Sequence, residues 1–168
     1  SKFLESGQTD YIDDFDSLDI PLFIPFELRK YYSKKDNQYF IGCGFSPRFQ
    51  RDASLLLGNG KTVAYTVIQL AFCMGFQDVY IIGKDHTYQT TAKAGTAIEV
   101  KGEDLNHFSS DYYKPGMKWD APDHDTEEYA YKLSRKEYER FGRKIYNATI
   151  GGKLEIFERV DFHTLFPK

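Results

Sequence analysis

The stretch LLLGNGKTVAYTVIQLAFCMGFQDVYIIGKDH, residues 55–86, decides the fold class of this chain. It holds a glycine-rich turn at residues 58–60, an apolar run over about residues 61–74 and a second, shorter apolar run over residues 78–83. The first run has the length of a helix, and the second is typical of a buried parallel strand. The stretch therefore predicts an α/β fold with a Rossmann-like parallel sheet flanked by helices. Such folds bind ligands beyond the carboxyl ends of their strands.

One face of the predicted helix is expected to be buried. Val63, Val67, Leu70 and Met74 recur at three- and four-residue steps, which is the spacing of a helical stripe packed against a core. Gly75 follows at the position where a left-handed residue commonly ends a helix.

The remaining sequence predicts further elements around this unit. A second helix is expected over about residues 126–141, because Asp123 and Asp125 open it and Gly142 closes it. Other expected features, in chain order, are an irregular acidic segment at 1–20, an edge strand or extended segment at 20–26, a helical turn at 27–32, a strand at 39–42, a loop at 44–53, a long irregular lid or binding loop at 84–121, a strand at 144–147 and a polar loop before a short docked segment. We expect a single α/β domain over residues 1–168, with an irregular N-terminal segment at 1–54 and a core at 55–166.

Composition excludes several classes of protein. The chain has 168 residues with a formal net charge of -3, which disfavours nucleic acid as a partner because a basic surplus would be needed. No stretch reaches the about 18 apolar residues of a membrane span, and the first residues lack the pattern of a secretion signal. Together with two unpaired cysteines, these features predict a protein of the cytoplasm or of the inner membrane face, with homo-oligomerisation left open.

No metal site is predicted. The four histidines are scattered along the chain without a spacing that is typical of metal ligands. Asp123, Asp125 and Glu127 cluster at the start of the second predicted helix, and we expect them to cap it.

The glycine-rich turn is a candidate anion site. Gly58-Asn59-Gly60-Lys61-Thr62 is similar to the end of a P-loop, but Leu55 stands where that motif requires glycine. Backbone N–H groups at a helix N-terminus can still hold a phosphate, so Asn59, Gly60 and Thr62 are candidate nucleotide contacts. The alternative is a tight turn without a ligand.

Three other groups of residues are candidates for ligand contacts. Asp85 and His86 follow the predicted strand 78–83, where they would bind ribose or sugar hydroxyls or stabilise the turn. His107 is a candidate general base, or alternatively a solvated histidine. Asn147 and Thr149 follow the strand 144–147 and would contact a base or ribose, or form a turn.

As a set, several segments resemble the DUF115 family, also named 6-hydroxymethylpterin diphosphokinase MptE-like. The resemblance spans roughly residues 55–166 and rests on residues 60–65, 69–71, 74–86, 106–108, 143–149 and 151–154. The later segments, 106–108, 143–149 and 151–154, look like the corresponding segments of family members from bacterial surface-glycan loci.

The order of these segments is also similar to that of bacterial sialyltransferases of glycosyltransferase family 42. By position, this similarity implies that Asn59 and Gly60 meet a nucleotide, Asp85 lies near the donor, and Asn147 and Thr149 line the pocket. Two departures are visible in the sequence. Asp111 stands where those enzymes have the catalytic histidine, while His107 matches an earlier histidine; Thr87 stands where a tyrosine steadies the leaving phosphate, with Tyr88 one step beyond.

The resemblance implies a transferase that uses a nucleotide sugar as donor and a glycan acceptor for cell-surface glycan synthesis, with His107 or Asp111 as base and no cofactor. One alternative is an ATP-dependent 6-hydroxymethylpterin diphosphokinase, which would require Mg²⁺. Another is a non-catalytic nucleotide-binding remnant. The glycine turn that holds the nucleotide in such folds is missing before residue 55, and residue 1 is not Met. We therefore expect the C-terminal part of a larger domain.

Overall fold

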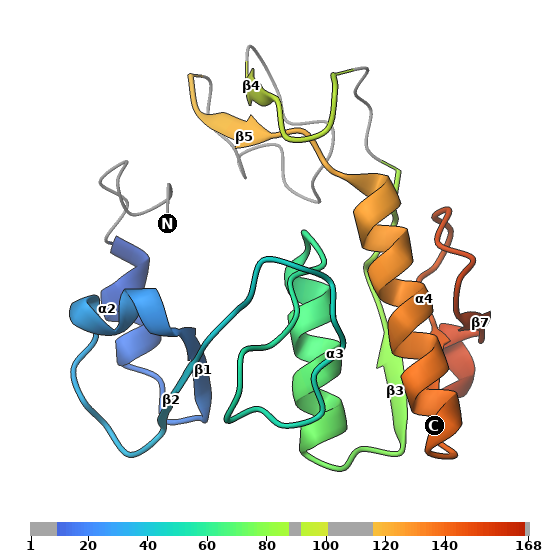
Figure 1. Ribbon diagram of the computed structural model, residues 1–168, viewed down its shortest axis with the longest axis horizontal. Coiled ribbons are helices and arrows are strands. Elements are labelled where there is room, and N and C mark those ends of the chain that lie inside the picture. The colour runs from blue at the N-terminus through green and yellow to red at the C-terminus, as the bar shows by residue number, and fades with distance from the viewer. Residues whose placement is uncertain (1–9, 88–91, 101–115, 167–168) are drawn as a thin grey trace.

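A computed structural model describes residues 10–87, 92–100 and 116–166 of the chain. Its fold is mixed α/β, with small parallel sheets and helices (Figure 1). None of the helices in these ranges is long and apolar enough to cross a membrane. The elements, with η marking 3₁₀ helices, are α2 (Asp10–Asp16), β1 (Leu22–Pro25), η1 (Phe26–Tyr31), β2 (Gln38–Ile41), α3 (Val63–Cys73), β3 (Asp78–Ile81), β4 (Ala97–Glu99), β5 (Lys118–Asp120), α4 (His124–Arg140), β6 (Lys144–Asn147), β7 (Glu158–Arg159) and η2 (Phe162–Thr164).

The central unit is a parallel sheet in the order β3-β6-β7. β3 and β6 are joined through α4, and their register pairs Asp78 with Lys144 and Ile81 with Asn147. This strand-helix-strand connection is the one that a parallel pair requires. It confirms the predicted helix-strand pattern, and the predicted strand 144–147 coincides with β6.

A second parallel pair lies in the N-terminal part. β1 and β2 pair in register from Leu22 with Gln38 to Pro25 with Ile41, and η1 lies between them in the chain. The strand and the helical turn expected here are confirmed. The expectation of an irregular segment at 1–20 is wrong for residues 10–16, which form α2.

The main core lies between α3, α4 and the central sheet. The phenol of Tyr138 on α4 is fully buried and donates a hydrogen bond of 2.8 Å to the carbonyl oxygen of Ile68 on α3. Phe72 packs edge-to-face on the same ring, with centroids 5.2 Å apart. The buried members of this cluster are Ile68, Phe72, Tyr131, Tyr138, Ile145, Leu154 and Phe157.

The predicted buried stripe of the first helix is wrong. Val63, Val67 and Met74 are 78%, 55% and 54% exposed, and only Leu70 of the four is buried. The helix is apolar over most of its circumference, so several three- and four-residue patterns fit it equally well. The face that packs inward carries Tyr65, Ile68, Gln69, Leu70, Ala71 and Phe72.

Two further expectations differ from the structure. β3 is only partly covered: Val79 and Ile81 pack against the main core, whereas Tyr80 points to the opposite face and is 44% exposed. The section 84–121, expected to be irregular, contains the antiparallel pair of β4 and β5. The expected helix ends are confirmed: Gly75 and Gly142 have φ angles of 88° and 67°, and Asp123 caps α4.

Candidate functional site

The loops that follow β3 and β6 meet at the carboxyl edge of the central sheet. The backbone N–H of Lys84 donates to the hydroxyl of Thr149 at 3.2 Å, and the N–H of Lys153 donates to the carbonyl oxygen of Asp85 at 2.7 Å. Gly152 packs so closely that a Cβ there would lie 2.7 Å from that oxygen. The two loops therefore form one continuous edge, which is where open parallel sheets hold ligands.

The amino-terminal ends of α3 and α4 lie at this same end of the unit, at the top in Figure 1. A Cβ on Gly60, before α3, would lie 2.6 Å from the Cβ of Ala130 on α4. The pKa of Asp123 is lowered first by hydrogen bonds from Thr126 and also by the nearby charge of Lys61. Two helix N-termini and two strand ends are thus gathered together.

The predicted nucleotide contacts in the glycine-rich turn also shape the turn itself. The Oδ1 atom of Asn59 accepts a 2.9 Å hydrogen bond from the N–H of Lys61. The hydroxyl of Thr62 caps α3 by accepting from the N–H of Ala64 at 3.4 Å. Gly60 is required by its close approach to α4.

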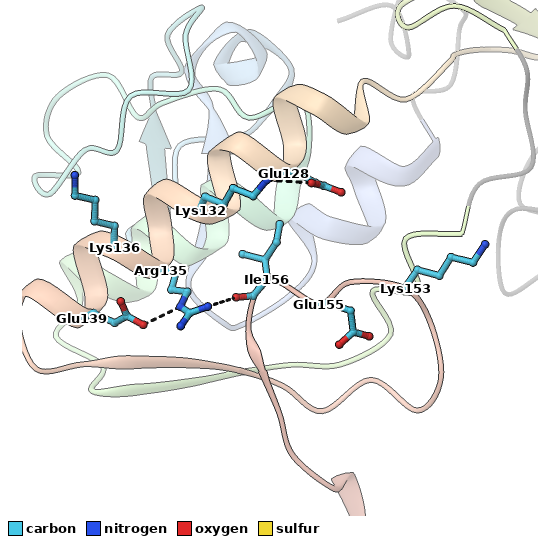
Figure 2. A pocket seen from close by; sticks show the side chains of 8 residues that line it. All are labelled: Glu128, Lys132, Arg135, Lys136, Glu139, Lys153, Glu155 and Ile156. Carbon is cyan, nitrogen blue, oxygen red and sulfur yellow. Dashed lines mark hydrogen bonds and ion pairs between the residues drawn. The ribbon is translucent and has the colours of Figure 1, made fainter.

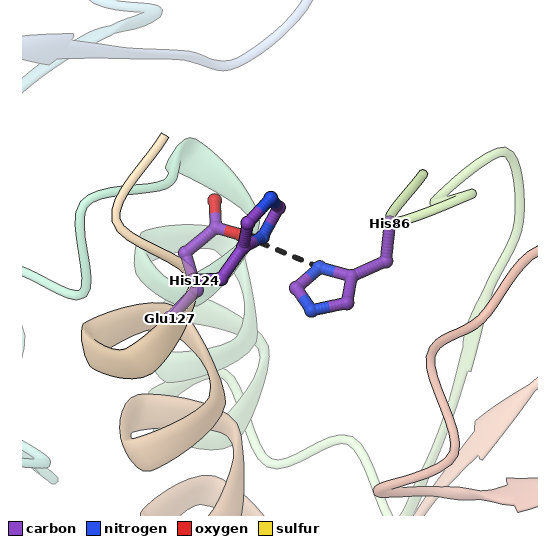
Figure 3. A group of neighbouring side chains, drawn as sticks. All are labelled: His86, His124 and Glu127. Carbon is purple, nitrogen blue, oxygen red and sulfur yellow. Dashed lines mark ion pairs between the residues drawn. The ribbon is translucent and has the colours of Figure 1, made fainter. Parts of the chain in front are cut away.

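The predicted pair after β3 divides into an exposed and a buried side chain. Asp85 is exposed, whereas the His86 side chain is only 7% exposed. The backbone of His86 lies in the left-handed region with φ of 56°, where histidine is enriched over most other residues. This conformation turns the imidazole toward the first turn of α4 (Figure 3).

His86 meets two residues of α4 there, His124 and Glu127. Its Nδ1 atom is 3.4 Å from Oε2 of Glu127, and Nδ1 of His124 is 3.7 Å from the same oxygen. The two imidazole rings meet edge-to-face with centroids 4.6 Å apart. We call these three residues the His–His–Glu cluster.

The cluster is largely shielded from water. The side chain of Glu127 is 5% exposed, and that of His124 is 38% exposed. Burial is the main cause of the lowered pKa of His86, with further lowering by His124 and Lys84, while Glu127 acts in the opposite direction. His86 is therefore held toward its neutral form, the form in which an imidazole nitrogen can act as a ligand or base.

Two charged groups surround the cluster. The ammonium group of Lys84 lies 3.5 Å from Oε1 of Glu127, the carboxylate oxygen that faces away from the two imidazoles. Oε1 of Glu128 lies 3.6 Å from Nε2 of His86. Each buried member of the cluster thus has a charged neighbour outside the cluster.

Hydrogen bonding of the cluster is incomplete in the described part of the chain. Nδ1 of His86 and Oε2 of Glu127 are both buried, and neither makes a hydrogen bond there. Buried polar atoms are nearly always hydrogen-bonded, so two facing exceptions make this position a candidate ligand site.

The side chains of Asn147 and Thr149, which were predicted to contact a ligand, form hydrogen bonds within the protein. Asn147 is 1% exposed; its amide donates to the carbonyl oxygen of Leu154 at 2.7 Å and accepts from the N–H of Thr149 at 2.9 Å. These bonds match the turn-forming alternative that the sequence left open. The remaining predicted site residues, Tyr88, His107 and Asp111, lie outside the described residues.

Sequence reasoning missed His124, Glu127 and Lys84. His124 and Glu127 are three residues apart at the start of α4, a spacing that places both on one helix face. The expectation that Glu127 caps the helix is wrong, because the cap is Asp123 alone: its Oδ1 accepts from the N–H of Thr126 at 3.1 Å. Because Asp123 caps the helix, Glu127 is not needed as a cap. Its spacing from His124 is the sequence signal that could have identified the two residues as a pair.

A charged groove of about 430 Å³ runs between α4 and residues 153–156 (Figure 2). Two ion pairs lie in it: Lys132 pairs with Glu128 at 3.2 Å and Arg135 with Glu139 at 2.8 Å. Arg135 also donates to the carbonyl oxygen of Ile156. The groove therefore carries charges of both signs rather than a site of one sign.

No family model matches this chain, and no curated protein or solved structure matches it at a significant level. The resemblance to the DUF115 family and to family 42 sialyltransferases accordingly stays a prediction from the quoted residues.

Proposed function

We propose that the chain is a transferase domain that binds a nucleotide-activated donor, a nucleotide sugar, at the carboxyl edge of β3 and β6. The observation that supports this most is the gathering of the two strand-end loops and the N-termini of α3 and α4 at one end of the unit. Helix N-termini favour the negative charge of phosphates. The sequence resemblance supplies the class of donor.

Within this proposal, exposed residues at the carboxyl edge of the sheet bind the donor. Buried residues hold the two loops in place. The carboxylate of Asp85 is exposed beside the junction of the two loops, where it can accept hydrogen bonds from sugar hydroxyls. Asn147 and Thr149 hold the loops in register and act on the donor through that geometry.

The reaction is a direct displacement. The acceptor hydroxyl oxygen forms a bond to the anomeric carbon while the bond from that carbon to the phosphate oxygen breaks. The hydroxyl proton passes to a general base, assigned from sequence to His107 or Asp111, and the nucleotide leaves with the bonding electrons. His107→Ala and Asp111→Ala should differ sharply in turnover, and full activity of both variants would refute the assignment.

Thermal unfolding with a nucleotide panel tests the proposal. A ligand at one hundred times its dissociation constant adds about 2.7 kcal/mol to stability, enough to raise the melting temperature by a few degrees. We expect stabilisation by CMP, CDP, UDP or GDP. Stabilisation by ATP with Mg²⁺ alone would replace the proposal with the diphosphokinase alternative, and no stabilisation by any nucleotide would overturn it.

Variants of β3 localise the binding. Asp85→Ala, at the carboxyl end, should weaken nucleotide-sugar binding at least tenfold without loss of stability, because the side chain is exposed. Asp78→Ala is the matched control, since Asp78 is an exposed aspartate at the amino-terminal end of β3, whereas Asp85 lies in the loop after its carboxyl end. Equal effects of the two substitutions would remove the site from this edge. Transfer of sugar to an acceptor, followed directly, separates an enzyme from a non-catalytic remnant.

A further inference from the structure

We propose that the His–His–Glu cluster binds a divalent transition-metal ion of the zinc type, with Nδ1 of His86, Nδ1 of His124 and Oε2 of Glu127 as ligands. The proposal does not depend on the nucleotide-binding function. It rests on the spacing of the three atoms, on their chemistry and on their surroundings.

The spacing of the atoms fits a single ion. Bonds of about 2.0–2.1 Å in tetrahedral geometry place neighbouring ligand atoms about 3.3 Å apart. Oε2 of Glu127 lies 3.4 Å from Nδ1 of His86 and 3.7 Å from Nδ1 of His124. The three residues can each offer one ligand atom such that these atoms lie within 4.8 Å of one another. Small side-chain rotations suffice to close the remaining difference.

The chemistry of the donor set selects the class of metal. Two imidazole nitrogens and one carboxylate oxygen suit Zn²⁺, Co²⁺ and Fe²⁺, whereas Mg²⁺ and Ca²⁺ take oxygen ligands. Three protein ligands would leave one tetrahedral position for water or a substrate oxygen.

The unsatisfied atoms give an independent reason for an ion at this place. Nδ1 of His86 and Oε2 of Glu127 face each other while buried, and within the described ranges neither finds a hydrogen-bond partner. Their side chains are 7% and 5% exposed. An ion between them would bind both orphaned atoms at once.

The outer contacts complete the pattern of a metal centre. Histidine ligands commonly direct their second nitrogen to a carboxylate, and Oε1 of Glu128 lies 3.6 Å from Nε2 of His86. Lys84 contacts Oε1 of Glu127 at 3.5 Å, which leaves Oε2 directed at the two imidazoles. The left-handed backbone of His86 is maintained at the loop position that delivers its ring to this point.

Calorimetric titration of metal-stripped protein tests the proposal. We expect one Zn²⁺ or Co²⁺ ion per chain, with Mg²⁺ binding at least a hundredfold more weakly. Glu127→Gln and His86→Ala should each weaken Zn²⁺ binding at least a hundredfold. Glu127→Gln is nearly isosteric, and circular dichroism of each variant separates loss of a ligand from loss of the fold.

Matched controls complete the experiment. Glu137→Gln changes a half-buried glutamate of the same helix α4, and His163→Ala removes an exposed histidine of η2; both should leave Zn²⁺ affinity unchanged. Absence of Zn²⁺ and Co²⁺ binding would overturn the proposal. It would also be overturned by unchanged affinity in a correctly folded Glu127→Gln variant, or by equal losses in the controls.

Discussion

The side chain of Gln69 and the His–His–Glu cluster are two polar groups of the central unit. They differ in whether their buried polar atoms have hydrogen-bond partners. The side chain of Gln69 on α3 is fully buried, and its Oε1 atom accepts from the N–H groups of Gln50 and Gly58, each at 2.9 Å. Its Nε2 atom donates to the carbonyl oxygens of Gly58 and Tyr65 at 3.0 and 3.1 Å. All four hydrogen-bonding positions of the amide are satisfied.

In the His–His–Glu cluster the side chains of His86 and Glu127 are nearly as enclosed, at 7% and 5% exposed, but their facing atoms lack hydrogen-bond partners in the described residues. The buried amide of Gln69 has a structural role, because its four hydrogen bonds fix the loop before α3. Buried atoms without hydrogen bonds are not explained by the fold in this way, and this difference is the reason that we propose a ligand at the cluster.

Replacing Gln69 should have the largest effect on stability. Gln69→Ala leaves the buried N–H and carbonyl groups of Gly58 without partners, and we expect a loss of about 3–5 kcal/mol. Urea denaturation measures it. Gln77→Ala is the control, because Gln77 is exposed with one bond of 3.1 Å, and should change stability by less than about 0.5 kcal/mol. Similar values for the two variants would contradict the structural role of Gln69.

Replacing Glu127 should show the opposite behaviour. Without metal, Glu127→Gln is expected to change stability by only about 1 kcal/mol, because no hydrogen bond to Oε2 is lost and the amide oxygen of glutamine can still accept from Lys84. With Zn²⁺ at one hundred times the wild-type dissociation constant, the variant should lack the about 2.7 kcal/mol that the ion adds. Thermal unfolding with and without Zn²⁺ measures both. A large loss in the absence of metal would make the cluster a structural group like Gln69.

Asn147 provides a second satisfied group, at the edge of the proposed donor site. Asn147→Ala leaves the N–H of Thr149 and the carbonyl of Leu154 unpaired, and we expect a loss of about 2 kcal/mol. Denaturation measures this loss, and a nucleotide titration of the folded variant measures direct contact with a ligand. Unchanged stability together with abolished nucleotide binding would show that Asn147 contacts the ligand itself.

Ser134 should give the smallest effect. It is fully buried on α4, and its hydroxyl donates to the carbonyl oxygen of Ala130 at 3.1 Å, an acceptor already within the helix. Ser134→Ala leaves no group unsatisfied, so its cost should stay below about 1 kcal/mol by urea denaturation. A larger cost would show that the burial of the side chain, rather than the number of hydrogen-bonding groups left without a partner, determines the loss of stability at these positions.

Local signals account for what the sequence predicted correctly. The limits of α4 follow from the cap Asp123 and the left-handed Gly142, which act within one turn of the helix. The buried face of α3 was predicted wrongly because its apolar residues surround the helix. A polar residue, Gln69, faces inward there, since distant backbone groups need its amide.

The candidate cluster could not be predicted because its members are brought together by the fold. His86 is positioned by the end of β3, whereas His124 and Glu127 are positioned by the start of α4. The sequence predicted that residues after β3 contact a ligand, and it identified His86 among them. It contained no local pattern that joins His86 to α4 across the intervening segment.

Anomalous diffraction at the zinc absorption edge, from crystals grown with one equivalent of Zn²⁺, tests the metal proposal most directly. We predict one strong anomalous peak bounded by Nδ1 of His86, Nδ1 of His124 and Oε2 of Glu127, at bonding distance from all three. A peak only at His163 or at the cysteines, or none at the cluster, would contradict the account.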